Sequence, residues 1–181
     1  MPSPAAPDRR LLRDATREDA SACAAIYAPY VTATAITFEA EPPSATEMAE
    51  RIATASRRHA WLVLEDDARV VGYAYGRELN PRAAYRWACE VSVYVELDCR
   101  GTGAGTALYA ELLRRLTERG YRVAVAGLTL PNEASVALHR AMGFEPVGTY
   151  RRIGFKLGAW HDVAWTQRIL DGGGDPPAEP L

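Results

Sequence analysis

The stretch SVYVELDCRGTGAGTALYAELL, residues 92–113, contains signals for a strand, a glycine-rich turn and a helix in direct succession. β-Branched residues alternate at its start, the turn Arg100–Gly105 follows, and leucines at helical spacing complete it. The first N–H groups of a helix lack partners and carry a partial positive charge, so this turn attracts phosphate. Glycines permit positive φ and let a pyrophosphate approach the backbone closely. The stretch therefore predicts an α/β fold with an anion site where the strand gives way to the helix.

Strands and helices continue to alternate on both sides of this stretch. Upstream, a short strand at 11–13, a helix opened by Thr16, a second helix opened by the capping box Ser44-x-x-Glu47, and a hairpin of strands 61–65 and 69–76 are expected. The central strand spans 87–96 and its helix 103–119. Downstream, the pattern predicts a strand at 123–126, a helix capped by Asn132, and strands near 144–152 and 163–169. This order predicts an α/β domain, with a mixed central sheet flanked by helices and parallel neighbours in its middle.

The two ends of the chain differ in composition from the rest. Residues 1–10 are rich in proline and alanine, and residues 171–181 in glycine, proline and acidic residues. Such segments cannot bury enough apolar surface to fold. We therefore expect disordered tails at 1–10 and 171–181 around a single domain at 11–170.

The composition argues against several classes of function. The chain has 181 residues, 48% of them hydrophobic, and a net charge of −2, which leaves no basic excess for general binding to nucleic acid. No apolar run is long enough for a membrane span and no secretory signal opens the chain, so we expect a cytoplasmic protein without membrane contact. Its three cysteines have no C-x-x-C spacing, so neither disulfides nor a metal site are expected.

The glycine turn fits one phosphate motif better than two others. The dinucleotide pattern G-x-G-x-x-G fails because position 106 is Thr, and the P-loop fails for lack of a Gly-Lys-Ser/Thr ending. What remains is R-x-x-G-x-G, and the stretch 92–113 resembles the core of the Gcn5-related N-acetyltransferases (GNAT). The segment NEASVALH at 132–139, followed by Gly143-Phe144, resembles the second block of that superfamily. The resemblance implies the GNAT fold and acetyl-CoA as co-substrate.

Further segments narrow the resemblance to one subgroup. TFE at 37–39, AYRW at 84–87, EVSVYV at 90–95 and GFKLGAWHDV at 154–163 are similar to phosphinothricin and methionine sulfoximine N-acetyltransferases. Together the similar segments extend over about residues 11–170. Membership would imply a homodimer that acetylates the α-amine of a small amino acid, often in a detoxifying or herbicide-resistance role.

Two residues are candidates for catalysis. An α-amine has a pKa of about 8, so a base must deprotonate it before it attacks a thioester. Glu90 lies on the strand face opposite three valines, where partial burial would strengthen it as a base; a salt bridge to Arg82 or Arg86 is the alternative. His139 occupies a position where many superfamily members have a tyrosine, and it could protonate the leaving thiolate. The alternative for His139 is a helix histidine with a water-facing edge.

The resemblance also implies binding residues for both substrates. Backbone groups of the central strand would bond the pantetheine arm, the turn would hold the pyrophosphate, and Asn132 would reach the pantetheine while capping its helix. The expected cofactor-binding residues are Val93, Tyr94, Val95, Arg100, Gly101, Thr102, Gly103, Ala104, Gly105, Thr106 and Asn132. The expected acceptor-binding residues are Phe38, Asn80, Arg82, Tyr85 and Ser92.

Charge at the acceptor site bears on the choice of acceptor. A guanidinium at Arg82 can bind a carboxylate through two hydrogen bonds. Relatives that take phosphinothricin commonly have a second basic residue where this chain has Asn80. Losing that charge would weaken the binding of a second anionic group, so methionine sulfone or methionine sulfoximine is as plausible an acceptor as phosphinothricin.

Two other functions use the same sequence features. A peptide or ribosomal-protein N-terminal acetyltransferase would keep the glycine turn and replace the closed amino-acid pocket by an open acidic groove. A non-catalytic acyl-CoA sensor would bind the cofactor without needing Glu90 or His139.

Overall fold

The computed structural model describes residues 10–170, 174, 175 and 177–181. The expected tail at 1–10 therefore lies outside the described residues except for Arg10, which opens the first strand. Of the expected tail at 171–181, residues 171–173 and 176 lie outside them as well. The described part of that segment contacts the preceding domain: the Glu179 carboxylate pairs with Arg86 at 2.6 Å, and Trp87 Nε1 donates to the carbonyl of Ala178.

The elements follow the predicted order, and they form one mixed sheet. The strands are β1 (Arg10–Asp14), β2 (Trp61–Asp66), β3 (Arg69–Glu78), β4 (Ala88–Val95), β5 (Val123–Leu130), β6 (Glu145–Lys156) and β7 (Ala159–Ile169). The α-helices are α1 (Ala20–Ala33), α2 (Ala45–Arg58), α3 (Ala104–Glu118) and α4 (Glu133–Ala141). Short 3-10 turns are η1 (Arg17–Asp19), η2 (Ala83–Tyr85) and η3 (Leu97–Cys99).

The strand order in the sheet is β1-β2-β3-β4-β5-β7-β6. Only β4 and β5 are parallel; every other neighbouring pair is antiparallel. The single parallel pair sits in the middle of the sheet and α3 connects its two strands, as the crossover argument predicts. The expectation of a mixed sheet flanked by helices is confirmed.

Two buried clusters cover the two faces of the sheet. On one face, Leu108, Leu112 and Leu116 of α3 are fully buried with residues of β2 to β5. On the other face, residues of α1 and α2 enclose Trp61, Val63 and Tyr73. The Ser44 hydroxyl accepts the backbone N–H of Glu47 at 3.2 Å, so the predicted capping box does open α2. No helix in the described part of the chain is long and apolar enough to cross a membrane.

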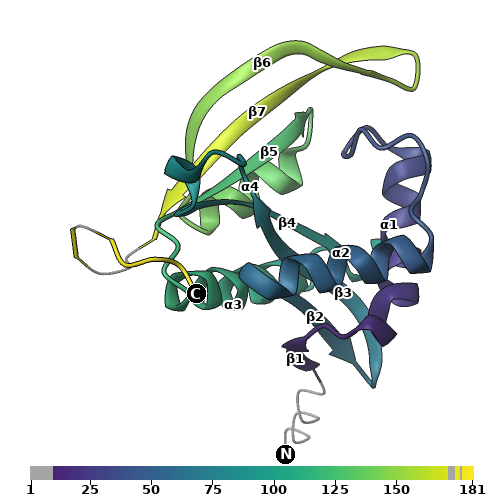
Figure 1. Ribbon diagram of the computed structural model, residues 1–181. Coiled ribbons are helices and arrows are strands. Elements are labelled where there is room, and N and C mark those ends of the chain that lie inside the picture. The colour runs from purple at the N-terminus through teal and green to yellow at the C-terminus, as the bar shows by residue number, and fades with distance from the viewer. Residues whose placement is uncertain (1–9, 171–173, 176) are drawn as a thin grey trace, which may run out of the picture.

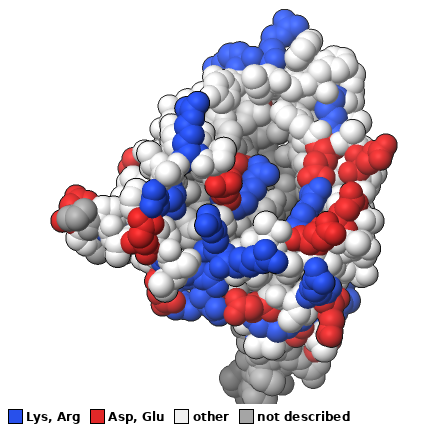
Figure 2. Space-filling view, in the orientation of Figure 1, with Lys and Arg blue, Asp and Glu red and all other residues white. Residues whose placement is uncertain are grey.

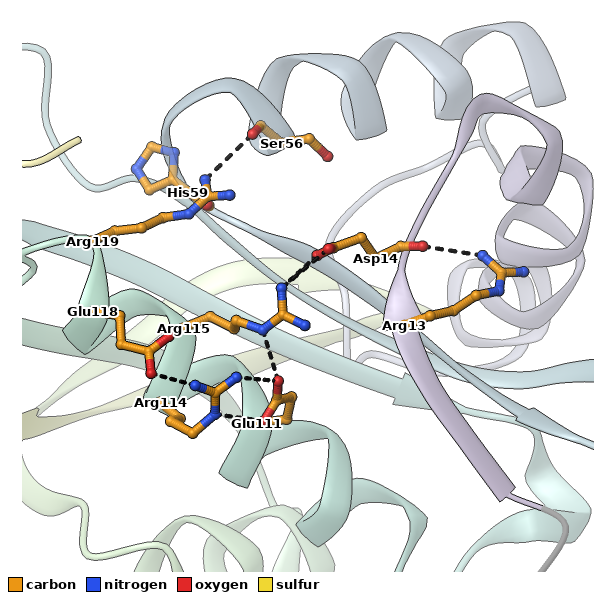
Figure 3. Close-up of polar contacts among 9 residues, drawn as sticks. All are labelled: Arg13, Asp14, Ser56, His59, Glu111, Arg114, Arg115, Glu118 and Arg119. Carbon is orange, nitrogen blue, oxygen red and sulfur yellow. Dashed lines mark hydrogen bonds and ion pairs between the residues drawn. The ribbon is translucent and has the colours of Figure 1, made fainter.

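Charged side chains join α3 to the edge of the sheet (Figure 3). Arg115 lies between two carboxylates, 3.0 Å from Asp14 Oδ2 on β1 and 2.7 Å from Glu111 Oε1. Arg114 bonds both oxygens of Glu111 and also pairs with Glu118. These contacts lie on the outer side of α3, where solvent weakens each pair.

The C-terminal strands are longer than the sequence predicts. β5 continues past Ala126 to Leu130, and β6 and β7 form an arm that arches away from the sheet toward the α1–α2 connection (Figure 1). Pairing with β7 along all eight residues of β5 extends that strand across Gly127, where local propensity is weak. Lys156, the only lysine of the chain, donates to the carbonyls of Val31 at 2.6 Å and Thr37 at 2.7 Å, and so fixes the arm to that connection.

Candidate active site

The central feature of the site is an opening between β4 and β5. The two strands pair only at Ala88–Val123, Cys89–Ala124 and Glu90–Val125. Beyond Glu90, β4 continues beside β3 alone, while β5 continues beside β7. The sheet therefore splits after Glu90, and within the described part of the chain one edge of β4 faces the gap without a partner strand. We call this gap the opening.

Backbone alternation determines which groups face the opening. The N–H of Glu96 donates to Val71 of β3 at 2.8 Å, so the even-numbered residues of β4 direct their backbone groups to β3. The odd-numbered residues face the opening. There the carbonyl of Val95 accepts the Tyr30 hydroxyl at 2.6 Å, and Tyr109 Oη lies 3.5 Å from the carbonyl of Val91.

Val93 lies between those two residues on the edge of the opening, so its N–H and C=O face a region without a partner strand. Among the three β4 residues expected to bond pantetheine, Val93 therefore has the best-placed backbone groups. The carbonyl of Val95 is already taken, and the backbone groups of Tyr94 face β3.

The glycine turn, residues 100–105, has the predicted geometry at two of its three glycines. Gly101 and Gly103 adopt φ of 74° and 84°, and a Cβ at either position would meet nothing within 4 Å. These glycines are needed for backbone conformation rather than for room. Gly105 differs because it lies inside α3, where a Cβ would stand 3.4 Å from Leu138 Cδ2. Its small size serves helix packing.

The other residues of the turn have mixed environments. The Arg100 guanidinium lies over the Tyr30 ring at 5.0 Å, and Thr102 Oγ1 donates to the carbonyl of Cys99 at 2.8 Å. Ala104 is buried, while Thr106 is exposed on the first turn of α3. The N-terminal N–H groups of this helix are consequently presented beside an exposed cation, as a pyrophosphate site requires.

Asn132 has the capping role expected of it. Its Oδ1 accepts the N–H of Ser135 at 3.2 Å at the start of α4. The cap uses the side-chain oxygen, so the amide N–H groups can serve another acceptor. Both functions expected of Asn132 are chemically compatible.

Glu90 pairs with a residue that the sequence analysis did not consider. Its Oε1 lies 2.6 Å from Nη2 of Arg77, not beside Arg82 or Arg86. The register explains this choice, because Arg77 of β3 stands directly opposite Glu90 of β4. The Glu90 side chain is 16% exposed. No local signal identifies Arg77, since the pairing depends on how β3 and β4 align.

His139 is buried, which contradicts the water-facing alternative. Its Nδ1 lies 2.7 Å from the carbonyl of Ser135, and its Nε2 lies 3.1 Å from Tyr109 Oη. Burial lowers the pKa of His139 and raises that of Tyr109. A neutral imidazole that donates from Nδ1 accepts at Nε2, so Tyr109 donates to it. Tyr109 was not among the predicted site residues, because it stands one residue after Leu108 in the helix and belongs to no distinctive motif.

Three of the five expected acceptor residues line one cleft. Asn80, Arg82 and Tyr85 border a hollow of about 950 Å³ together with Arg77 and residues of α2. Figure 2 shows the hollowed face between the β6–β7 arm and α2, with charged side chains of both signs around it. Arg82 has no ion-pair partner among the described residues, and its backbone N–H bonds Asn80 Oδ1 at 3.0 Å. A free guanidinium can bind a carboxylate.

Phe38 and Ser92 do not line that cleft. Phe38 packs under the arm: a Cβ at Gly154 would overlap its ring, so a larger residue there would force the ring to move. Ser92 is half-buried on β4 opposite Tyr75, whose side chain does line the cleft. The structure therefore brings Asn80, Arg82 and Tyr85 together and places the other two at different positions around the site.

Comparisons with known proteins agree with this geometry. An acetyltransferase (GNAT) domain model matches residues 12–165. A phosphinothricin N-acetyltransferase of Streptomyces viridochromogenes is 36% identical over 167 residues, covering 91% of each chain. An L-methionine sulfoximine/L-methionine sulfone acetyltransferase of Pseudomonas paraeruginosa is 38% identical, covering 88% of this chain and 94% of that one.

A solved structure is similar over nearly the same extent. It is a GNAT superfamily phosphinothricin acetyltransferase of Sinorhizobium meliloti in complex with AcCoA, 39% identical, with a TM-score of 0.89 and 94% of each chain covered. The split sheet, the glycine turn and these similarities agree, and the chain belongs to the GNAT family of acetyltransferases.

Proposed function

We propose that this protein transfers the acetyl group of acetyl-CoA to the α-amine of a small amino acid such as phosphinothricin, methionine sulfoximine or methionine sulfone. The observation that carries the proposal is the opening, with Glu90 at its inner end, Val93 on its edge and the glycine turn after it. The names of the relatives support the acceptor class, and the neighbour in complex with AcCoA supports the acyl donor.

The donor site uses backbone groups. Acetyl-CoA, when bound, supplies an activated acetyl thioester. N–H groups of the glycine turn and the first turn of α3 hold its pyrophosphate beside Arg100. The N–H and C=O of Val93 bond the pantetheine arm, and the side-chain amide of Asn132 adds a donor. An N–H at the edge of the opening, aimed at the thioester oxygen, stabilises the negative charge that develops there.

The acceptor site uses side chains. Arg82 binds the α-carboxylate, and Glu90 removes a proton from the ammonium group, directly or through one water. The freed amine forms a bond to the acetyl carbon as the bond from that carbon to sulfur breaks. The nitrogen then gives up its second proton to solvent, while the sulfur keeps the electron pair of the broken bond and takes a proton from solvent.

His139 acts in this proposal as a positioning residue. Both of its ring nitrogens are engaged, and Nε2 holds the Tyr109 hydroxyl near the carbonyl of Val91 at the inner end of the opening. These contacts hold Tyr109 of α3 against α4 and leave no ring nitrogen of His139 free to protonate the leaving sulfur.

The test is release of the CoA thiol from acetyl-CoA in the presence of phosphinothricin, methionine sulfoximine, methionine sulfone or a peptide with a free N-terminus. We expect turnover of at least one free amino acid. Glu90→Gln removes the base and should lower kcat about 10²- to 10⁴-fold, with little change in KM for acetyl-CoA. Glu18→Gln, at an exposed carboxylate on η1, is the matched control.

Other outcomes would assign other functions. Turnover of the peptide alone would favour a peptide or ribosomal-protein N-terminal acetyltransferase. Binding of acetyl-CoA without turnover, unaffected by Glu90→Gln, would favour an acyl-CoA sensor. Mass spectrometry of the product identifies the acetylated amine.

We also propose that the protein is a homodimer. Six large apolar side chains of the β6–β7 arm are more than half exposed: Val147, Tyr150, Ile153, Phe155, Leu157 and Trp160. A patch of this kind marks a surface suited to association. Light scattering after gel filtration should give twice the chain mass, and a monomeric mass at micromolar concentration would contradict the proposal.

A further inference from the structure

Arg77 lies where it can control the proposed base. It stands directly opposite Glu90 in the β3–β4 register, and opposite residues of an antiparallel pair project from the same face of the sheet. Its Nη2 is 2.6 Å from Glu90 Oε1. A charge-assisted hydrogen bond of this length occupies one of the carboxylate oxygens that would accept a proton.

The guanidinium also separates the base from the cleft. The Arg77 side chain is 57% exposed and lines the cleft, whereas Glu90 is 16% exposed and is not among the lining residues. A ligand in the cleft therefore meets Arg77 before it meets Glu90. When Arg77 releases Oε1 and moves aside, an amine in the cleft gains direct access to the Glu90 carboxylate.

The other arginines of the cleft are arranged differently. Arg51 bonds both oxygens of Glu39, at 2.8 and 3.0 Å, and Arg86 pairs with Glu179. Arg82 has no ion-pair partner among the described residues and is already assigned to the α-carboxylate. Asn80, also in the cleft, is neutral. Arg58 also lines the cleft and has no ion-pair partner among the described residues, but it does not contact Glu90. Arg77 is the arginine of the cleft that bonds Glu90, so an anionic group held by Arg77 acts on the base directly.

We propose that Arg77 binds a second anionic group on the acceptor and, in doing so, releases Glu90 to act as the base. This inference rests on the proposed function and names the substrate class within it: amino acids whose side chain carries a negative charge. A neutral side chain gives Arg77 no alternative partner, so the base stays covered. Arg77 thereby supplies the charge that position 80 lacks.

Phosphinothricin and methionine sulfone form a matched pair for the test. Both end in a methyl group on a tetrahedral centre with two oxygens, and they differ by one negative charge. We expect the wild-type protein to have a kcat/KM at least tenfold higher for phosphinothricin. Arg77→Ala should reduce the ratio of kcat/KM for phosphinothricin to kcat/KM for methionine sulfone at least tenfold. The KM for phosphinothricin should rise, while the kcat for methionine sulfone should stay the same or increase.

Two further variants separate this role from a structural one. Arg77→Lys keeps the charge and should retain part of the preference for phosphinothricin. Arg114→Ala removes an arginine of α3 that does not line the cleft, and it should change kcat/KM for neither phosphinothricin nor methionine sulfone (Figure 3).

The outcomes are distinct. Equal losses on both acceptors in Arg77→Ala and Arg77→Lys would reduce Arg77 to a structural partner of Glu90 and overturn the inference. A wild-type protein that prefers methionine sulfone would also overturn it, while the proposed function would stand. If the wild-type protein acetylates no amino acid, the proposed function fails and this inference fails with it.

Discussion

Along β4, the sheet is closed at one end and open at the other. Up to Glu90 the strand has neighbours on both sides, and Cys89 is fully buried in the same cluster as Leu112. Beyond Glu90 only β3 stands beside it, and Val93 is half-buried. Both parts have the same alternation of side chains, so the difference comes from the neighbouring strand. Stability should therefore depend on the closed part, and ligand binding on the open part.

The largest expected effect lies beneath the closed part. Leu112→Ala removes a fully buried side chain and should lower the free energy of unfolding by about 2–5 kcal/mol, measured by urea denaturation. Leu11→Ala, at a residue 53% exposed on β1, should cost far less. The KM for acetyl-CoA of the folded variant should not change. A large rise in that KM would break the division between the two parts.

The next largest effect is a dependence of the free energy of unfolding on pH, through His59. Burial, with the neighbouring cations of Arg119 and Arg58, lowers the pKa of His59 to about 4. Figure 3 shows Arg119 beside His59. The unfolded chain has an imidazole pKa of about 6.5 and binds a proton first as pH falls. The contribution of neutral His59 to the free energy of unfolding is thus complete above pH 6.5 and is lost as the pH falls toward 4. The loss at pH 4.5 is about 2–3 kcal/mol.

His59→Gln isolates that contribution. The glutamine does not titrate, so urea denaturation between pH 7 and 4.5 should show a shallower loss of stability than in the wild-type protein. Activity at pH 7 should be retained. Identical slopes for both proteins would contradict the assignment.

A smaller effect lies in the open part. Gly103→Ala places a Cβ at φ 84°, which costs about 1–2 kcal/mol and alters the turn that presents its N–H groups. KM for acetyl-CoA should rise. Gly143→Ala is a matched control, because Gly143 has φ 77° at the end of α4: it should cost similar stability without changing that KM. A rise of the KM for acetyl-CoA in both variants would show that backbone strain elsewhere in the fold also disturbs cofactor binding.

The smallest effect lies outside both parts. Hydrogen bonds from Arg114 and then Arg115 lower the pKa of Glu111 to about 2. The contribution of this carboxylate to the free energy of unfolding is therefore present above pH 4.5 and declines as pH falls toward 2. Solvent reduces the benefit, and Glu111→Gln should cost less than about 1 kcal/mol at pH 7. The difference from the wild-type protein should shrink at pH 3 and in 1 M salt. A constant difference would indicate packing instead of charge.

Local signals were enough for most of the elements. The capping oxygens of Ser44 and Asn132 act within three residues, and glycine permits the positive φ that Gly101 and Gly103 adopt. The face occupied by Glu90 followed from strand alternation. The lengths of β5, β6 and β7 did not follow, because pairing between distant strands extends them beyond their local propensity.

The sequence by itself determined the order of strands and helices, the glycine turn and the residue types available for chemistry. The tertiary structure decided that β4 and β5 separate after Glu90, that Arg77 pairs with Glu90, and that His139 is buried against Tyr109. The physical reason is one of range. Caps and turns depend on neighbours a few residues away, whereas strand register and burial depend on segments that meet only when the whole chain has folded.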